Sequence, residues 1–411
     1  MKILFIHQNF PGQFKHLAPY LVAQGHQVDA LHMQASLLKE HFGVTTHCYG
    51  VTRASSKVIH PWVADFETKV IRGEACFLKM KELSRAGYVP DVIFSHHGWG
   101  ETLFLREVWP NTPLIIYCEF HYEPRGLDVN FDPEFSNHDD GEPCRVSMKN
   151  INNYLHFRIA QAGMSPTYWQ ASTFPLPFRE QIKVIHDGID TQALIPDETT
   201  EIAINHKIKL RRSDEVITFV NRNLEPYRGF HIFLRSLPAI LRQRPTARAI
   251  LIGGNGVSYG APPKDAKSWR EHFVNEVRPQ MSDEEWSRVH FVGSVPYEQF
   301  LAIMRISSAH VYLTYPFVLS WSLLEAMSMQ CPIVGSNTGP LREVIEDGHN
   351  GFLVDFFDQV ALTEKIIELL KNKALGKKLG VRGRKLVVEN YDLKRVCLPA
   401  QRDFIQGIAL G

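Results

Sequence analysis

Short apolar runs alternate with longer helical patterns along this chain, and the alternation occurs twice. In the first half, the strand-like runs are apolar or β-branched and lie between turn residues, at 2–6, 27–32, 91–95 and 113–118. Helical patterns separate them at about 13–24, 62–86 and 100–108. Such alternation predicts parallel strands joined by right-handed crossovers, which form a doubly wound α/β sheet.

The second half repeats the pattern and predicts a second sheet of the same kind. Its strand-like runs lie at 216–221, 248–252, 289–292, 309–314 and 332–335. Its helical patterns lie at about 229–242, 297–306, 321–329 and 359–389. A chain of 411 residues is long enough for two cores. We therefore predict one domain over 1–190, a second over 191–390 that opens with a polar stretch (191–214), and a terminal helix within 391–411.

One segment interrupts the alternation in the first half. Residues 122–146 contain three prolines and two glycines together with many charged residues. We predict a long loop here, and loops of this length in compact domains often carry function.

Composition excludes several classes of protein. A net charge of +1 provides no global field for nucleic acid, although a local basic patch leaves peripheral membrane contact open. Six cysteines without a Cys-x-x-Cys pair argue against a zinc site or a disulfide scaffold and fit a reducing cytoplasm. The apolar run at 2–6 is too short for a signal peptide, and no run reaches the 18 apolar residues of a spanning helix.

Two strand–helix junctions in the second half predict a phosphate site. The run at 309–314 leads into a helix that Ser320 can cap, and a helix N-terminus at a strand's carboxyl end binds anions. About ninety residues upstream, Arg222 and Arg228 follow another strand. Two arginines beside a helix N-terminus suit a diphosphate, and a cation there opposes the helix dipole, so it lacks a structural reason to be present.

These two stretches resemble the family-4 retaining glycosyltransferases (glycosyl transferase group 1). That family shows Arg-x5-Lys, which Arg222 and Arg228 match with Arg in the Lys place. It also shows Glu-x7-Glu before Leu-Glu-Ala-Met, where Glu325 matches the second Glu and Phe317 replaces the first. The usual Phe-Gly-Leu is represented here by Val318, Leu319 and Ser320.

The resemblance implies a GT-B fold, with two Rossmann-like domains, an interdomain cleft and a last helix that crosses back to the first domain. It also implies that Arg222 and Arg228 bind the donor diphosphate and that Glu325 binds the ribose. No metal is then required, because the two arginines neutralise the leaving group. Phe317 cannot accept hydrogen bonds from the donor sugar. Either other groups hold that sugar, or it is less hydroxylated or acetamido, or the site is degraded.

Four further residues are predicted at the donor on the same resemblance. Gly12 belongs to a loop that approaches the donor phosphate in the family, although a plain turn explains a glycine equally well. Gly253 and Gly254 follow a strand near the diphosphate, and Val295 lies in the segment whose backbone reads the nucleobase. The chain lacks the Gly-x-Gly-x-x-Gly fingerprint of nicotinamide enzymes.

Candidate acceptor residues follow two strands of the first half. His97 is one of two adjacent histidines, which on a strand point to opposite faces and so rarely chelate one metal ion. His97, Glu101 and Arg125 are predicted acceptor contacts. Glu119 and His121 would share one strand face and position the acceptor or polarise the reacting face, unless they form a satisfied polar pair under the loop.

We therefore expect a retaining glycosyltransferase that moves a hexose-type sugar from a UDP- or GDP-sugar to a glycan, lipid-linked or small-molecule hydroxyl. The nucleotide sugar is a co-substrate, and no cofactor is expected. We expect it in the cytoplasm, with the inner membrane surface as an alternative. Rival functions are another GT-B enzyme, such as an epimerase or a phosphorylase, a nucleotide-sugar-binding protein without turnover, and, more distantly, a nicotinamide oxidoreductase.

Overall fold

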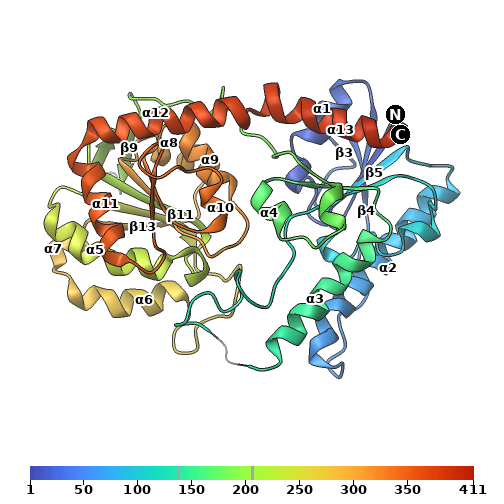
Figure 1. Ribbon diagram of the computed structural model, residues 1–411, viewed down its shortest axis with the longest axis horizontal. Helices are drawn as coiled ribbons and strands as arrows, with labels where there is room; N and C mark the ends of the chain where they lie inside the picture. Colours follow the sequence, from blue (N-terminus) through green and yellow to red (C-terminus); the bar gives the residue numbers. More distant parts are fainter. Residues whose placement is uncertain (137–138, 205–207) are drawn as a thin grey trace. The chain divides into compact units, whose positions relative to one another are not determined.

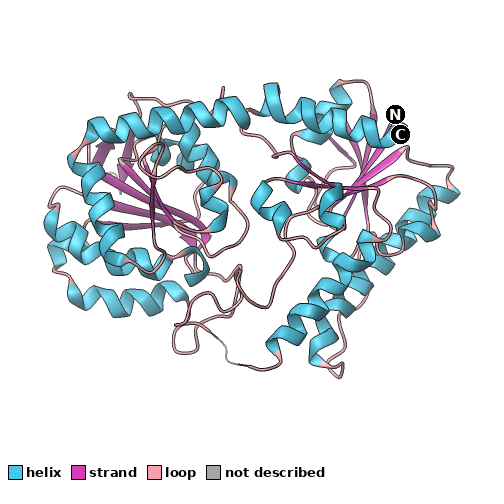
Figure 2. Cartoon of the chain, viewed as in Figure 1, coloured by secondary structure: helices cyan, strands magenta, loops and turns pink. Residues whose placement is uncertain are grey.

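The computed structural model describes residues 1–136, 139–204 and 208–411. The chain forms two compact units, which Figures 1 and 2 show as α/β structures. The first contains Met1–Gly188 and Leu393–Gly411, and the second contains Ile189–Asp392. The first segment of the first unit thus ends at Gly188, two residues before the boundary at 190 that we predict from the sequence.

The first unit is built on a sheet with the order β3-β4-β2-β1-β5-β6-β7-β8 in the described part of the chain. Its strands are β1 (Lys2–Ile6), β2 (Gln27–His32), β3 (Glu40–His41), β4 (Val44–Cys48), β5 (Val92–Ser95), β6 (Leu114–Tyr117), β7 (Ala162–Ser165) and β8 (Ile182–Val184). Neighbouring strands pair in parallel, except that β3 is antiparallel to β4. The predicted parallel sheet is confirmed, and short strands that the sequence did not reveal extend it at both edges.

Helices cover the faces of this sheet. They are α1 (Leu17–Ala23), α2 (Ala64–Arg85), α3 (Glu142–Phe157), α4 (Tyr168–Ser172) and α13 (Leu398–Leu410). Phe5, Phe14 and Phe94 are buried in one core cluster, and α13 adds Leu398 and Ile405 to the same cluster. The terminal helix therefore shares the core of the first unit although it follows the second unit in sequence.

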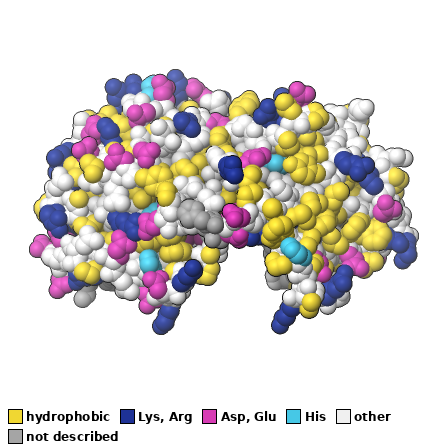
Figure 3. Space-filling view, turned by 60° about the horizontal axis from the view of Figure 1, so that its bottom comes forward, with side chains coloured by type: hydrophobic (Ala, Val, Ile, Leu, Met, Phe, Trp, Pro, Cys, Tyr) yellow, Lys and Arg dark blue, Asp and Glu magenta, His cyan; other side chains and the backbone are white. Residues whose placement is uncertain are grey.

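Helix α3 buries its polar side and exposes apolar side chains. Asn150, Asn153 and His156 are buried, whereas Tyr154 and Leu155 are 49% and 40% exposed. Figure 3 shows hydrophobic side chains gathered on the surface of the first unit, on the right of the view. The buried amides and imidazole are available for hydrogen bonds to the strand ends beneath the helix.

Unit two is built on a parallel sheet with the order β13-β12-β11-β14-β15-β16, again in the described residues. Its strands are β11 (Val216–Asn223), β12 (Arg248–Gly254), β13 (Val289–Gly293), β14 (Ala309–Tyr312), β15 (Ile333–Ser336) and β16 (Phe352–Val354). Its helices are α5 (Phe230–Gln243), α6 (Trp269–Val277), α7 (Asp283–Trp286), α8 (Tyr297–Arg305), α9 (Trp321–Ser328), α10 (Gly339–Arg342), α11 (Gln359–Lys371) and α12 (Lys373–Asn390). The second predicted sheet is confirmed as well.

Four predicted elements differ in the structure. The predicted helix at 100–108 is replaced by turns and a short 3-10 helix, η4 (Leu105–Glu107), after Gly100 adopts a left-handed conformation with φ 97°. The predicted helix at 359–389 is two helices, because Asn372 leaves the helical conformation and its side chain caps α12. The loop at 122–146 is shorter than predicted because α3 begins at Glu142, where a proline in the first turn favours a helix start.

The polar stretch at 191–214 contains a hairpin, β9 (Glu201–Ile204) and β10 (Ile208–Arg211). Ile204 and Leu210 from its two strands are buried in the second core, which explains why so polar a segment is ordered there. Residues 137–138 and 205–207, which belong to these two predicted segments, lie outside the described residues. Among the described residues, no helix combines the length and the apolar character needed to cross a bilayer.

Candidate functional site

Neighbouring strands of the second sheet end at the residues that the sequence assigns to the donor. Strands β13, β12, β11 and β14 pair in parallel, so their carboxyl ends lie at one edge. Arg222 lies at the end of β11, where Asn223 pairs with Gly254 of β12. Val295 follows β13, and 317–320 follow β14 before α9 begins. The structure therefore brings the predicted donor residues of the second half to the edge of the sheet at which ligands bind in such folds, whereas Gly12 lies in the first unit.

The two arginines at this edge differ in environment. Arg222 is exposed, and its side chain has no hydrogen bond or ion pair with the described residues. Arg228 is 6% exposed and donates from Nη1 to Thr314 Oγ1 at 2.7 Å and to the Val318 carbonyl at 3.2 Å. Arg228 is thus a fixed cation, whereas Arg222 is a charge at the surface that can turn toward a ligand.

Aromatic rings surround the buried guanidinium. Phe317 is 5% exposed, and its ring centroid lies 5.2 Å from that of Tyr227 and 5.1 Å from that of Tyr259. The Arg228 guanidinium lies 5.2 Å from the Tyr259 ring centroid and 5.8 Å from the Phe317 centroid. Burial acts to lower the pKa of Arg228, but Tyr312 and Tyr259 outweigh it, and the pKa lies above its usual value. Phe317 therefore packs beside a cation that forms no ion pair with the described residues, although the buried Glu225 carboxylate interacts with it electrostatically.

Helix α9 begins at the predicted N-cap. The Ser320 side chain accepts a hydrogen bond from the Ser322 N–H at 3.4 Å, which confirms the cap. One residue earlier, Leu319 packs into the core. Glu325, in the second turn, is 9% exposed and accepts a hydrogen bond from the Tyr297 hydroxyl at 2.7 Å. Burial, and then Glu325, raise the pKa of Tyr297, so this hydroxyl keeps its proton. Glu325 is thus held in one orientation beside the strand ends.

The two glycines at the end of β12, Gly253 and Gly254, allow a close approach to the Arg222 segment. A Cβ on Gly254 would lie 2.6 Å from Asn223 Oδ1, and one on Gly253 would also meet neighbouring atoms within 3.0 Å. The buried Glu225 carboxylate accepts a hydrogen bond from the Tyr259 N–H at 3.1 Å, in the loop after these glycines. The loop is therefore fastened to the segment that carries both arginines.

A second cluster forms at the strand ends of the first unit. Strands β1, β5 and β6 are parallel neighbours, and His7, His96 and Glu119 follow them in turn. The His96 ring stacks on Trp99 with centroids 4.1 Å apart and lies 5.2 Å from the His7 ring. Burial, and next the neighbouring His96, lower the pKa of His7 to about 3. The cluster therefore presents a neutral imidazole and one carboxylate, in contrast to the arginines of the second unit.

The sequence predicts that Glu119 and His121 share one strand face. They do not, because β6 ends at Tyr117, before both residues. The Glu119 side chain is 41% exposed, with Oε2 at 3.5 Å from His96 Nε2. His121 is 2% exposed, and its ring packs against Tyr154 and Phe174. Burial lowers the pKa of His121, although Glu123 acts to raise it. Of the two, Glu119 alone presents its polar end to solvent at the strand ends.

The predicted acceptor contacts are dispersed. His97 is 3% exposed and bonds through Nε2 to Asn153 Oδ1 at 2.9 Å, under α3. Glu101 is fully buried, accepts a hydrogen bond from Tyr49 at 3.2 Å and has its pKa raised by burial to about 7. Direct contact with an acceptor does not fit these two positions, because both side chains are enclosed. Arg125 is exposed in the loop before α3, and its role stays a prediction.

Sequence reasoning missed His96, Gln13 and Tyr297. Each lies within two residues of one that was named, next to His97, Gly12 and Val295 respectively. The signal for His96 was present, since side chains alternate at the end of a strand and only one of two adjacent histidines can face the site. The contact between Tyr297 and Glu325 joins residues 28 positions apart and left no local signal.

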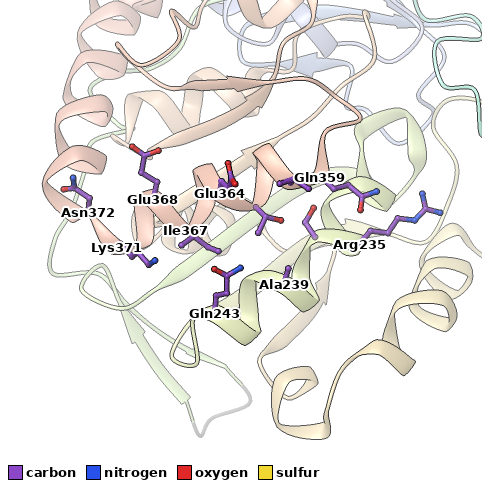
Figure 4. Close-up of a pocket in the computed structure, with 12 residues that line it drawn as sticks. Arg235, Ala239, Gln243, Gln359, Glu364, Ile367, Glu368, Lys371 and Asn372 are labelled. Carbon is purple, nitrogen blue, oxygen red and sulfur yellow. The ribbon is translucent and has the colours of Figure 1, made fainter.

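A groove of about 670 Å³ lies between α5 and α11, on the helices of the second unit. Figure 4 shows the side chains of the two helices facing each other across it, including Arg235 and Gln243 from α5 and Lys371 from α11. None of the residues predicted for the site lines this groove. The strand-end clusters therefore remain the candidate site.

Comparison with protein families identifies relatives over most of the chain. The family described as "Glycosyl transferase family 4 group" matches residues 24–194, and "Glycosyl transferases group 1" matches residues 201–386. Spore coat protein SA of Bacillus subtilis is 28% identical over 251 residues, which cover 55% of this chain and 58% of that protein. Phosphatidyl-myo-inositol mannosyltransferase of Mycobacterium leprae is 27% identical over 185 residues, 44% of each chain. The chain thus spans about half the length of these curated relatives.

Solved structures show the same fold over the whole chain. Sucrose-phosphate synthase from Thermosynechococcus elongatus has a TM-score of 0.74 at 18% identity and covers 100% of both chains. Anabaena Alr3699/HepE in complex with UDP-glucose has a TM-score of 0.66 at 16% identity, covering 100% of this chain and 98% of that one. At these identities the likeness concerns the fold, and the predicted GT-B fold is confirmed.

Proposed function

This chain belongs to the group 1 glycosyltransferases, and on that premise we propose that it transfers a hexose-type sugar from a nucleoside diphosphate to a hydroxyl acceptor with retention at the anomeric carbon. One observation carries the proposal. On the segment that ends β11 of the second unit, an exposed Arg222 and a buried Arg228 form no ion pair with the described residues. Two cations on one segment, of which Arg228 donates to the Val318 carbonyl just before α9, suit a diphosphate.

The charged donor residues would bind different parts of the donor, the arginines the diphosphate and the carboxylate the ribose. Arg222 and Arg228 would stabilise the negative charge that develops on the diphosphate as its bond to the anomeric carbon breaks, which is commonly a large term in catalysis. Glu325, oriented by Tyr297, would accept hydrogen bonds from the ribose. Gly254 would let backbone approach the phosphates, and the backbone at Val295 would contact the base.

The acceptor would be bound by the first unit. Its hydroxyl oxygen forms the new bond to the anomeric carbon, and its proton passes to the departing phosphate oxygen. Glu119 is the residue best placed to receive such a hydroxyl, since its carboxylate is 41% exposed at the strand ends. The acceptor class would be a glycan, a lipid-linked sugar or a small molecule. Two neighbours agree with a nucleotide-sugar donor, since HepE is described in complex with UDP-glucose and a Mycolicibacterium smegmatis relative is named as GDP-mannose-dependent.

The proposal predicts a shift in melting temperature with one nucleoside diphosphate. The protein is melted with UDP, GDP, ADP, dTDP and NAD, each with and without EDTA. A ligand at 100 times its Kd adds about 2.7 kcal/mol of stability, which moves the midpoint by a few degrees. The shift should survive EDTA, because the arginines replace a metal, and it should be lost in Glu325→Ala.

Glu298→Ala serves as the matched control, since Glu298 is exposed on the neighbouring α8 and should leave the shift intact. No shift with any diphosphate, or a shift with NAD alone, would contradict the proposal. A diphosphate shift without donor cleavage by any hydroxyl compound would instead favour a binding protein, the rival that the replacement of a family carboxylate by Phe317 suggests.

A further inference from the structure

The hydrogen bonds around His7 fix its tautomer. Its Nδ1 accepts from the Asn9 N–H at 3.0 Å, so the neutral ring carries its proton on Nε2. The ring is neutral near pH 7, because burial lowers its pKa to about 3. Nε2 therefore donates to Gln13 Oε1, 2.7 Å away. His7 is 2% exposed, so water does not compete for this bond.

The bond from His7 determines which way the Gln13 amide faces. With its oxygen held by His7, the amide turns its NH2 group toward Glu119, where Nε2 donates to Oε1 at 3.3 Å. Gly12 makes this arrangement possible. Its φ is 46°, and a Cβ there would lie 2.4 Å from the His7 ring. Only glycine lets the loop rest on the imidazole face.

His96 completes the surroundings of the carboxylate. Its ring is 3% exposed, and neither ring nitrogen has a hydrogen-bond partner among the described residues. Its Nε2 lies 3.5 Å from Glu119 Oε2. A buried imidazole without a partner costs free energy, and a ligand that bonds to it recovers that cost.

We propose that His7 and Gln13 are positioning residues that hold the Glu119 carboxylate, and that Glu119 with His96 binds an uncharged hydroxyl of the acceptor. A carboxylate that accepts and an imidazole N–H that donates match a hydroxyl, which does both. The same carboxylate repels a phosphate or carboxylate beside the reacting hydroxyl. This inference rests on the proposed function, and it adds residues and an acceptor class to it.

The test is a double-mutant cycle on the full-length protein. The assay follows release of the nucleoside diphosphate from the nucleoside diphosphate glucose that carries the base chosen by the melting screen, with methyl α-D-glucopyranoside as acceptor. His7→Leu and Glu119→Gln should each lower the acceptor kcat/KM about tenfold, and the double variant should lie within about threefold of Glu119→Gln alone. His7 then acts through Glu119. Independent effects that multiply to about a hundredfold would overturn the positioning role.

Conservative variants separate positioning from folding. His7→Gln keeps an N–H donor near the place of Nε2 and should retain most of the activity that His7→Leu loses. Gln27→Leu removes an exposed amide from neighbouring β2 and should leave kcat/KM unchanged. Equal losses in His7→Gln and His7→Leu would overturn the inference. All variants should keep the diphosphate melting shift, and its absence in the unmodified protein would instead contradict the proposed function.

A second experiment varies the charge of the acceptor. Glucose 6-phosphate should be a poorer acceptor than the methyl glucoside, and Glu119→Gln should narrow the difference because it removes the repelling charge. A preference for the phosphorylated sugar in the unmodified protein would overturn the acceptor class, while the proposed sugar transfer would still stand.

Discussion

The strand ends of the two units carry opposite chemistry on the same kind of sheet. In the second unit, Arg222 and Arg228 lie six residues apart on one segment and bring positive charge to the edge. In the first unit, His7, His96 and Glu119 follow three strands and bring two imidazoles and one carboxylate. The sheet supplies the edge in both units, and the side chains at its end decide whether that edge suits a diphosphate or a hydroxyl.

The difference extends to how each cluster is kept in place. Arg228 is fixed by Thr314, a carbonyl and aromatic rings, all of which tolerate a permanent cation. The His7 imidazole of the first unit is kept neutral by burial, which lowers its pKa to about 3. Stability of the first unit should therefore depend on pH, whereas the arginines of the second unit are indifferent to it.

Acidification is the largest expected effect. In the first unit, His7, His156 and His186 have their pKa lowered by burial to between about 3 and 4. Between pH 6.5 and 4 the unfolded chain binds protons at these sites and the folded chain does not. The free energy of unfolding therefore decreases as the pH is lowered through this range. At pH 5 each costs roughly 2 kcal/mol. Glu101, with its pKa raised to about 7, acts in the opposite direction. On acidification it adds about as much stability as one histidine removes.

For His7, His156, His186 and Glu101 together, the net loss of stability from pH 7 to pH 5 is on the order of 4 kcal/mol, and the buried His97, whose pKa burial also lowers, adds to it in the first unit. In the second unit the fully buried His310, whose pKa is about 3, accounts for about 2 kcal/mol, and the half-buried His290, whose pKa is about 4, adds a smaller amount because solvent screens it. Hydrogen exchange, corrected for the chemical exchange rate at each pH, measures the two units separately. Glu101→Gln should enlarge the loss in the first unit. Earlier loss of protection in the second unit would contradict this account.

The next effect concerns the exposed cation. Arg222→Ala should lower kcat/KM at least ~10²-fold, the scale for losing a preorganised charge partner, with little change in melting temperature because the side chain is exposed. Arg242→Ala, which removes an arginine that is also exposed from the end of α5, should change neither. A loss below threefold in a folded Arg222→Ala protein would contradict its role at the diphosphate.

The same contrast explains what the sequence could predict. Both sheets were predicted from apolar runs, because burial and alternation act locally. The donor residues follow single strands, so a short motif contains them. Glu119 was named, but its partners His7, Gln13 and His96 were not, since parallel pairing joins strand ends that are distant in sequence: His7 and His96 are 89 residues apart, and His96 and Glu119 are 23 apart. The pair of strands β9 and β10 was missed because each strand has only four residues and two isoleucine or leucine positions.

The smallest effect tests Phe317, which replaces the first Glu of the family motif. Phe317→Leu should cost about 1 kcal/mol of stability and raise the donor KM about threefold, because it removes ring contacts with Tyr227 and Tyr259 and loosens Arg228. Phe233→Leu is the matched control, since that ring is fully buried against Phe219 within the core. The control should lose similar stability and keep its donor KM. Equal donor KM values in the two variants would mean that Phe317 contributes packing alone and that Arg228 needs no aromatic support.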